Sequence, residues 1–304
     1  MGGILTVLVL AVGLYETNRN NNAAQNAATR QLQLATKQQV AQRLTDAVEQ
    51  LGQEDQKDND KLSVRIGAIV SLQRLMTDFP EDERAILQIL AAFVRTHATR
   101  PAAKLVALPS PPDVIAAVVV IGERTEHPNS NTPKHSVDTA GSFLALPPHS
   151  SALQGLNLAG MSLPGAYLHW AELDSAILRR SNLRYANFTM ASLEHVDLQF
   201  ANLYRADFTE AELEKTNFAD ANLAHADLRD ADFGGTIFED AALPFADLRG
   251  ADLTHTDIET WQLQCALIDT ATLLPVDAVR PPVPLSKDAL ATCEERYAHE
   301  LHYS

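Results

Sequence analysis

The stretch ANFTM ASLEH VDLQF ANLYR ADFTE AELEK TNFAD ANLAH ADLRD, residues 186–230, decides the fold because it divides into units of five residues. The same units run outward without an insertion from Ser151 to Pro275, which makes twenty-five of them. The third residue of every unit is apolar, with eighteen Leu, five Phe and two Ile, and sixteen of the first residues are Ala. Such a fixed internal period is the primary signal of a repeat architecture.

A period of five matches neither the alternation of a strand nor the ~3.6-residue turn of a helix. A four-sided coil does match it, with one unit on each side and the first and third residues of each unit pointing inward. Four units close one coil, and coils stack like parallel strands at ~4.8 Å. About six coils then form a rod of roughly 30 Å, in which each coil buries its apolar residues against its neighbours.

Units such as Ala201-Asn-Leu-Tyr-Arg and Ala226-Asp-Leu-Arg-Asp resemble the A-(D/N)-L-x-x consensus of the pentapeptide-repeat family over all of 151–275. The resemblance implies a right-handed quadrilateral parallel β-helix. The expected fold class is therefore α+β, a pentapeptide-repeat solenoid preceded by α-helices. Four upstream stretches resemble the helical region of bacterial, membrane-anchored members, which implies a transmembrane helix at the N-terminus: Leu44–Gly52, Val64–Leu75, Ile89–Arg95 and Asp113–Val118.

The first residues form an uncharged apolar run, Gly2 to Tyr15, that is shorter than the ~20 residues of a membrane-spanning helix. A truncated membrane anchor is the preferred interpretation, with a signal peptide and a buried core helix as alternatives. Basic residues follow the run at Arg19, Arg30 and Lys37, and none precedes it. The positive-inside rule then predicts a bacterial inner (cytoplasmic) membrane protein whose soluble part faces the cytoplasm.

The segment between this run and the repeats has helical spacing of its apolar residues. For Val114–Ile121 the alternatives are a helix and a buried strand, and the capping-box spacing of Ser110 and Asp113 favours the helix. The predicted organisation is a membrane anchor (1–15), a stalk helix (16–52), a small helical domain (53–124), a linker (125–150), the β-helix (151–275) and a tail with a short capping helix (276–304).

Charge and cysteine content limit the classes of function. The chain has a net charge of −15, and its repeat region alone has 19 acidic and 7 basic residues. This balance argues against direct binding of nucleic acid, which requires cations to neutralise phosphates, and it suits a basic protein partner. The two cysteines, Cys265 and Cys293, show no metal-binding or redox spacing and predict a reducing compartment.

Residues twenty apart stack in a four-sided coil, so the outward columns can be assigned from the sequence. Two columns form acidic ladders, which are the candidate partner-binding residues: Asp207, Asp227 and Asp247 in one, and Glu212, Asp232 and Asp252 in the other. A third column is an amide ladder of Asn182, Asn202 and Asn222. The alternative is structural, because Asp and Asn side chains also bond the backbone of tight turns.

No catalytic, cofactor-binding or metal-binding residues are predicted. His195 and His255 share a column but lie three coils apart, ~14 Å on this spacing, which is too far to bind one metal ion. His299 and His302 flank Glu300 without the order of an HExxH motif. The chain is therefore not expected to be an enzyme.

The leading hypothesis is a non-catalytic, membrane-tethered scaffold that presents its acidic β-helix to a protein partner. The alternative comes from the family, since some members resemble B-form DNA and occupy the DNA site of type II topoisomerases. The open end of a solenoid also invites stacking with another chain, so a homo-oligomer remains open.

Overall fold

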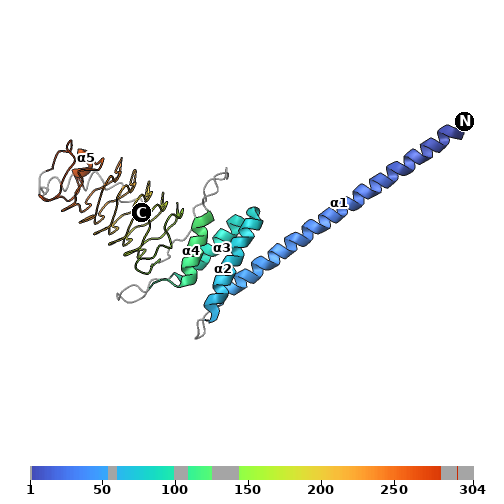
Figure 1. The fold of residues 1–304 in the computed structure, drawn as a ribbon, viewed down its shortest axis with the longest axis horizontal. Helices are drawn as coiled ribbons and strands as arrows, with labels where there is room; N and C mark the ends of the chain where they lie inside the picture. The colour runs from blue at the N-terminus through green and yellow to red at the C-terminus, as the bar shows by residue number, and fades with distance from the viewer. Residues whose placement is uncertain (1, 54–59, 99–108, 125–143, 282–292, 294–304) are drawn as a thin grey trace. The chain divides into compact units, whose positions relative to one another are not determined.

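The computed structural model describes residues 2–53, 60–98, 109–124, 144–281 and 293 (Figure 1). The chain divides into two compact units, Met1–Pro80 and Glu81–Ser304. Each is described below by itself.

The first unit is a pair of helices, α1 (Gly2–Leu51) and α2 (Asp60–Asp78). Only the last part of α1 packs against α2, through the buried side chains of Val40, Ala47 and Leu51. The segments expected to be an anchor and a stalk are thus one uninterrupted helix.

The predicted membrane anchor, and with it the inner-membrane localisation, is wrong. In the described part of the chain no helix has a run of apolar residues long enough to cross a bilayer. The physical reason lies in the sequence of α1, whose apolar start passes without a break into a segment that is rich in asparagine and begins with Arg19.

The second unit begins with a short 3-10 turn (Pro80–Asp82) and two packed helices, α3 (Glu83–His97) and α4 (Pro112–Arg124). The prediction of a helix rather than a strand around residues 114–121 is confirmed by α4. Val114, Val118 and Ile121 of this helix are fully buried.

Helix α4 lies against the first coil of the repeats (Figure 1). A Cβ at Gly122 would come within 2.9 Å of Leu158 and 3.3 Å of Leu156, so glycine permits the close approach. Just before the helix, the Ser110 hydroxyl accepts a hydrogen bond from the Ala145 amide at 2.9 Å. The helix therefore covers one end of the solenoid, where open backbone groups would otherwise be exposed.

The repeats form a stack of parallel coils. Residues twenty apart pair through single parallel bridges, from Asn157 with Ile177 to Asp247 with Leu267. No extended strand forms among the described residues, because each side of the coil contributes one bridging residue before the chain turns. Every third-position side chain from Leu153 to Ile268 is buried, as the period predicts.

The fifth residue of most units closes a corner in the left-handed backbone region. Non-glycine residues there have φ between 52° and 61°, for example Arg180 at 56° and Tyr185 at 59°. L-residues seldom adopt this conformation. The stacking of coils must therefore compensate for its cost at each corner.

The pairing begins before the first unit of the repeat. Leu144, Ala145 and Leu146 are buried, and Ala145 forms a parallel bridge with Tyr167. The segment expected to be a linker thus contributes its last residues to the solenoid, while 125–143 lie outside the described residues. No five-residue phase marks this entry, so the period could not reveal it.

The last coil departs from the pattern. A short helix, α5 (Thr260–Leu263), replaces a bridging side and leaves Trp261 40% exposed. The register then slips by one residue, because Asp252 bridges Leu273, twenty-one residues on. As a result Thr272 is buried and Leu273 is 51% exposed, against the expectation for a third position.

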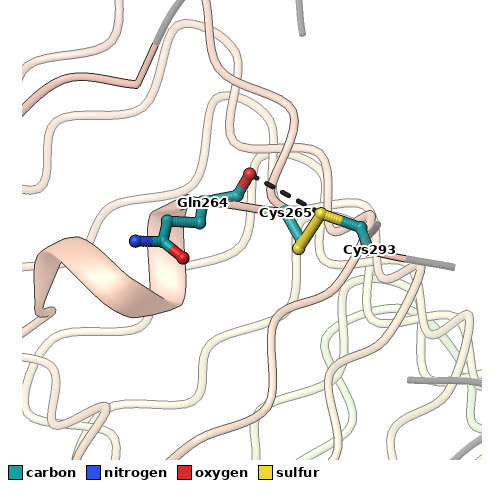
Figure 2. The surroundings of a disulfide bond; sticks show 3 residues. All are labelled: Gln264, Cys265 and Cys293. Carbon is teal, nitrogen blue, oxygen red and sulfur yellow. Dashed lines mark hydrogen bonds between the residues drawn. A yellow bond between two sulfur atoms is a disulfide. The ribbon is translucent and has the colours of Figure 1, made fainter. Parts of the chain in front are cut away.

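A disulfide bond joins Cys265 in this coil to Cys293 in the tail, with the Cα atoms 5.7 Å apart (Figure 2). Both cysteines are buried, and Phe245 packs against them. The expectation of reduced cysteines is therefore wrong. The predicted capping helix of the tail falls mostly on residues 282–292 and 294–304, which lie outside the described residues.

Candidate interaction surface

The second-position side chains have a structural role along the whole rod. The Oδ1 atom of Asn202 accepts the amide of Tyr204 at 3.2 Å, and that of Asp207 accepts the amide of Thr209 at 3.0 Å. The same bond recurs at Asp252. Each such side chain satisfies a backbone donor where the chain turns, as Asp and Asn commonly do. The structural alternative is therefore confirmed for the aspartates and asparagines of the ladders, whereas Glu212 forms no such bond within the described residues.

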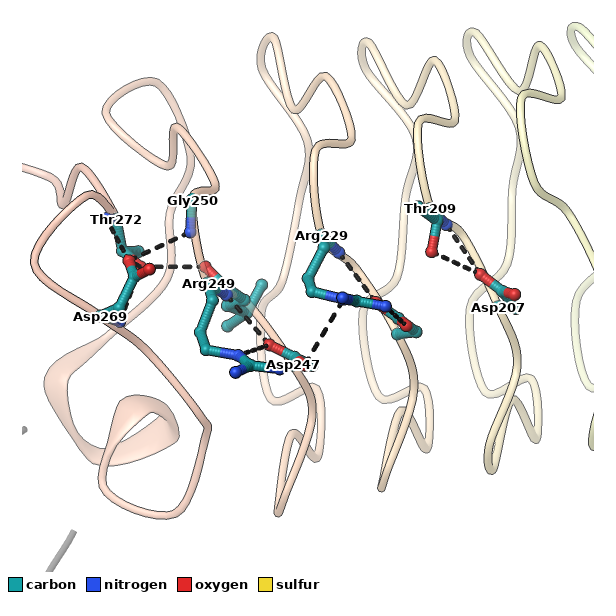
Figure 3. Close-up of polar contacts among 10 residues, drawn as sticks. Asp207, Thr209, Arg229, Asp247, Arg249, Gly250, Asp269 and Thr272 are labelled. Carbon is teal, nitrogen blue, oxygen red and sulfur yellow. Dashed lines mark hydrogen bonds and ion pairs between the residues drawn. The ribbon is translucent and has the colours of Figure 1, made fainter. Parts of the chain in front are cut away.

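The first acidic ladder is partly neutralised by arginines two residues further along the chain (Figure 3). Arg229 binds Asp227 at 2.6 Å and reaches Asp247 at 3.5 Å, and Arg249 binds Asp247 at 2.6 Å. At Asp207 the Thr209 hydroxyl donates to the carboxylate at 2.7 Å and leaves its charge in place. Two of the three carboxylates on this column, Asp227 and Asp247, are therefore paired with a cation.

The ion pair between Asp227 and Arg229 shifts the pKa of both groups. Burial alone would raise the pKa of Asp227, but hydrogen bonds from the side chain and amide of Arg229 outweigh it and lower that pKa below its usual range. The same hydrogen bond and the charge of Asp227 raise the pKa of Arg229. Asp227 is thus held as a carboxylate by its own chain. The Asp-Leu-Arg spacing of the two units was the signal in the sequence that could have revealed this pairing.

The second acidic ladder is different, because its three side chains are exposed and successive members are bridged in one column: Glu212, Asp232 and Asp252. No ion pair involves these three carboxylates within the described residues. The pKa of Asp252 is lowered by hydrogen bonds from the hydroxyl and amide of Thr254, so it stays charged.

The turns on either side of this ladder add further acidic residues. We call the combined surface the acidic face, and its members are Glu210, Glu212, Glu214, Asp230, Asp232 and Asp252. The same turns also hold cations: Arg229 and Arg249, which bind Asp227 and Asp247, and Lys215, which binds Glu214 at 2.8 Å. The hydrogen bond and charge of Lys215 lower the pKa of Glu214. Two members of the first ladder thus have arginine partners, whereas no member of the second has one among the described residues.

The surface shows no arrangement for metal chemistry. Within the described ranges, no three His, Cys, Asp or Glu side chains are grouped so that they could hold a metal ion.

Comparison with known proteins agrees with this architecture. The family model described as "Pentapeptide repeats (8 copies)" matches residues 162–199, 201–240 and 216–254. These residues therefore carry pentapeptide repeats. Pentapeptide repeats imply a right-handed quadrilateral β-helix, and proteins built from them are in general structural or interaction proteins.

Several solved structures of this family resemble the chain. A pentapeptide repeat protein from the thylakoid lumen of Arabidopsis thaliana is 29% identical, over 33% of this chain and 70% of that one, with a TM-score of 0.32. QnrB1, a plasmid-mediated fluoroquinolone resistance protein, is 17% identical over 45% and 77%, with a TM-score of 0.33. HetL, from the cyanobacterium Nostoc, is 29% identical over 41% and 50%, with a TM-score of 0.23. No curated protein sequence matches the chain.

Proposed function

We propose that the repeat domain is a non-catalytic protein-interaction module that binds a basic protein partner through the acidic face. The observation that carries the proposal is the exposed column of Glu212, Asp232 and Asp252, which has no arginine of its own to neutralise it.

Stacked like charges destabilise the domain that carries them. Carboxylates at coil spacing, ~4.8 Å, repel one another because like charges directly opposite on paired backbones are unfavourable. A lysine- or arginine-rich segment laid along the column would relieve this repulsion. Such complementarity accelerates association and is weakened by salt.

The ladder of Asp207, Asp227 and Asp247 is less suited to this role, since a partner would have to displace Arg229 and Arg249 from the last two. We therefore place the binding site on Glu212, Asp232 and Asp252 rather than on the first ladder.

The alternative of a DNA mimic acting on a type II topoisomerase has less support. A mimic of the duplex needs free carboxylates along more than one face, to reproduce charge on both strands. Here the column next to the acidic face is occupied by ion pairs.

The test compares two variants of the full chain for binding to poly-lysine. The acidic-face variant is Glu212→Gln with Asp232→Asn and Asp252→Asn. The matched control removes both ion pairs of the neighbouring column without changing the net charge: Asp227→Asn with Arg229→Gln, and Asp247→Asn with Arg249→Gln. Asparagine keeps the turn bond of each aspartate that it replaces. We expect the acidic-face variant to lose roughly tenfold in affinity at low salt, which corresponds to ~1.4 kcal/mol.

We expect the control to lose much less, because its carboxylates are already paired. Equal losses in the two variants would refute the assignment to the acidic face. Inhibition of topoisomerase supercoiling by micromolar wild-type protein, abolished in the control variant, would favour the DNA mimic instead.

A further inference from the structure

A different face of the rod, which we call the amide face, carries a self-complementary pattern. Its centre is the bridged column of Asn182, Asn202, Asn222 and Ala242. The turns that begin and end each side of the coil form its two edges. The first edge consists of the turns that precede this column, at residues 179–180, 199–200, 219–220 and 239–240. The second edge consists of the turns that follow it, at residues 184–185, 204–205, 224–225 and 244–245.

The first edge has opposite charges at its two ends. Arg179 and Arg180 lie in one coil, and Glu239 and Asp240 lie three coils further on. The distance between these coils, ~14 Å, is too large for an ion pair within one chain. Arg179 binds Asp197 at 3.3 Å within its own chain. The guanidinium of Arg180 lies over the ring of Phe200, 5.1 Å from its centroid, and Phe200 is 44% exposed.

An antiparallel second copy would match this pattern. A two-fold axis that crosses the rod between the coils of Asn202 and Asn222 brings Arg180 of one copy to Asp240 of the other. The same operation brings Arg179 to Glu239, and symmetry forms each pair twice. Isologous contacts of this kind require a surface complementary to itself.

The same two-fold rotation also brings the second edge of one copy against the second edge of the other, with residues of complementary size. Tyr204 would face the buried Ala224, a large residue opposite a small one. Tyr185, which is 50% exposed, would face the ring of Phe245. Aromatic pairs across such a contact stabilise it beyond the area that they bury.

The centre of the face offers hydrogen-bonding groups without charge. Asn202 would face Asn222 of the second copy. In each chain their Oδ1 atoms accept the amides of Tyr204 and Ala224, at 3.2 and 3.0 Å, which leaves the NH₂ groups to donate. Amide groups can therefore bond across the axis without breaking the turns.

We propose that two copies of this protein associate side by side and antiparallel through the amide face. The acidic face is less suited to such pairing, because the same operation about Asp232 would bring Asp232 against Asp232 and Glu212 against Asp252. The dimer leaves the acidic face of each copy open, so the inference does not rest on the proposed function. Since the face is one side of a slender rod, the interface is small and the dimer weak.

The test uses charge reversal on the full chain, followed by sedimentation velocity at ~100 μM protein and low salt, conditions that reveal weak electrostatic association. One variant carries Arg179→Glu with Arg180→Glu, and the other carries Glu239→Arg with Asp240→Arg. Wild-type protein should dimerise, and each variant alone should remain monomeric because like charges then meet at both ends of the face.

An equimolar mixture of the two variants should form a heterodimer, since one copy then presents four acidic side chains and the other four basic ones. The matched control, Glu212→Lys with Asp232→Lys on the acidic face, should dimerise as wild type does. Circular dichroism melts check that each variant is folded, which is expected because the substituted residues lie on the surface.

Three outcomes would overturn the proposal. They are a monomeric wild type at this concentration, dimers of either variant alone, and a mixture that stays monomeric. A dimer held together by another part of the chain would persist in both variants and is thereby distinguished.

Discussion

The central coils, from Leu178 to Leu253, and the last coil, from Thr256 to Pro275, carry the same five-residue pattern but fold differently. In the central coils every backbone corner lies between two like neighbours, and parallel bridges repeat without a break. Among the described residues, the last coil has a neighbouring coil on one side only. A repeat is uniform where a coil on each side satisfies its backbone groups, as expected for a quasi-one-dimensional fold.

In the last coil, side chains form hydrogen bonds with backbone groups that a further coil would otherwise satisfy. Gln262 donates to the carbonyl oxygens of Phe238 and Ala241 at 2.6 and 3.0 Å. The carboxylate of Asp269 accepts the amides of Thr272 and Ala271 at 2.9 and 3.0 Å (Figure 3). Burial raises the pKa of Asp269, but hydrogen bonds from the Gly250 amide, the Thr272 hydroxyl and these two amides outweigh it and lower that pKa. The last coil is thus held by specific bonds rather than by the period.

The largest effect should come from breaking the aromatic core of the central coils. Phe218 is fully buried between Phe208 and Phe238, with ring centroids 5.6 and 5.5 Å away. Phe218→Ala should lower the free energy of unfolding by ~3–5 kcal/mol, because it leaves a cavity. Urea denaturation measures the change. Phe200→Ala on the surface is the control, and an equal loss there would contradict the packing described.

The disulfide should be the next largest contribution, and it acts on the last coil. Cys265 and Cys293 are 28 residues apart, and closing such a loop stabilises the folded state by ~2–4 kcal/mol. Cys293→Ser should lose this amount under oxidising conditions. Adding a reductant should then lower the urea midpoint of the wild type but leave the variant unchanged. A wild type that is insensitive to the reductant would show that the bond does not stabilise the fold.

Gln262 tests the hydrogen bonds that replace a bridge. Gln262→Ala removes the donor to two buried carbonyl oxygens and should cost ~1–3 kcal/mol. Gln199→Ala, on the surface of the central coils, should change stability by less than about 0.5 kcal/mol. Thermal melts of both variants provide the measurement. Equal melting temperatures would mean that α5 needs no such anchor.

His225 connects the two regions, because its ring stacks on Phe245, which packs against the disulfide. Burial, and then the charge of Arg205, lower the pKa of His225. The fold therefore favours the neutral ring, and this stability is present above the unfolded value of ~6.5 and is lost as the pH falls through the lower folded value.

His225→Phe should remove this part of the pH dependence. The measurement is the difference in urea midpoint between neutral pH and a pH below the folded pKa, for the variant and the wild type. An unchanged difference would exclude His225 as its source.

The smallest effect on stability is expected at Leu273, where the period predicts burial but the side chain is exposed. Leu273 occupies a third position but is half exposed, so Leu273→Ala should cost less than about 0.5 kcal/mol. Leu253→Ala, one coil earlier and fully buried, should cost ~2–5 kcal/mol. Urea denaturation of the two variants measures both changes. Similar losses in the free energy of unfolding would show that Leu273 belongs to the core.

The errors of the sequence interpretation share one cause. The anchor was predicted from the apolar run of residues 2–15, from the basic residues that follow it and from the resemblance of the upstream stretches. The polar residues that continue the same helix were assigned to a separate stalk. Reduced cysteines were inferred from the lack of a spacing motif, which carries no information on a pair joined across 28 residues. Both properties, membrane anchoring and the oxidation state of the cysteines, depend on residues outside the short segment from which they were predicted.

The sequence by itself determined the coil, its register and its buried residues, because a five-residue period imposes the same local demand at each unit and one solution satisfies all of them. Only the tertiary contacts reveal that the solenoid includes Leu144–Leu146, that its register slips at Leu273, that Cys265 bonds Cys293, and that arginines pair with Asp227 and Asp247 but with no member of the second acidic ladder. Each of these features depends on an individual contact between residues that do not occupy equivalent positions in the repeat. The five-residue period therefore does not predict them.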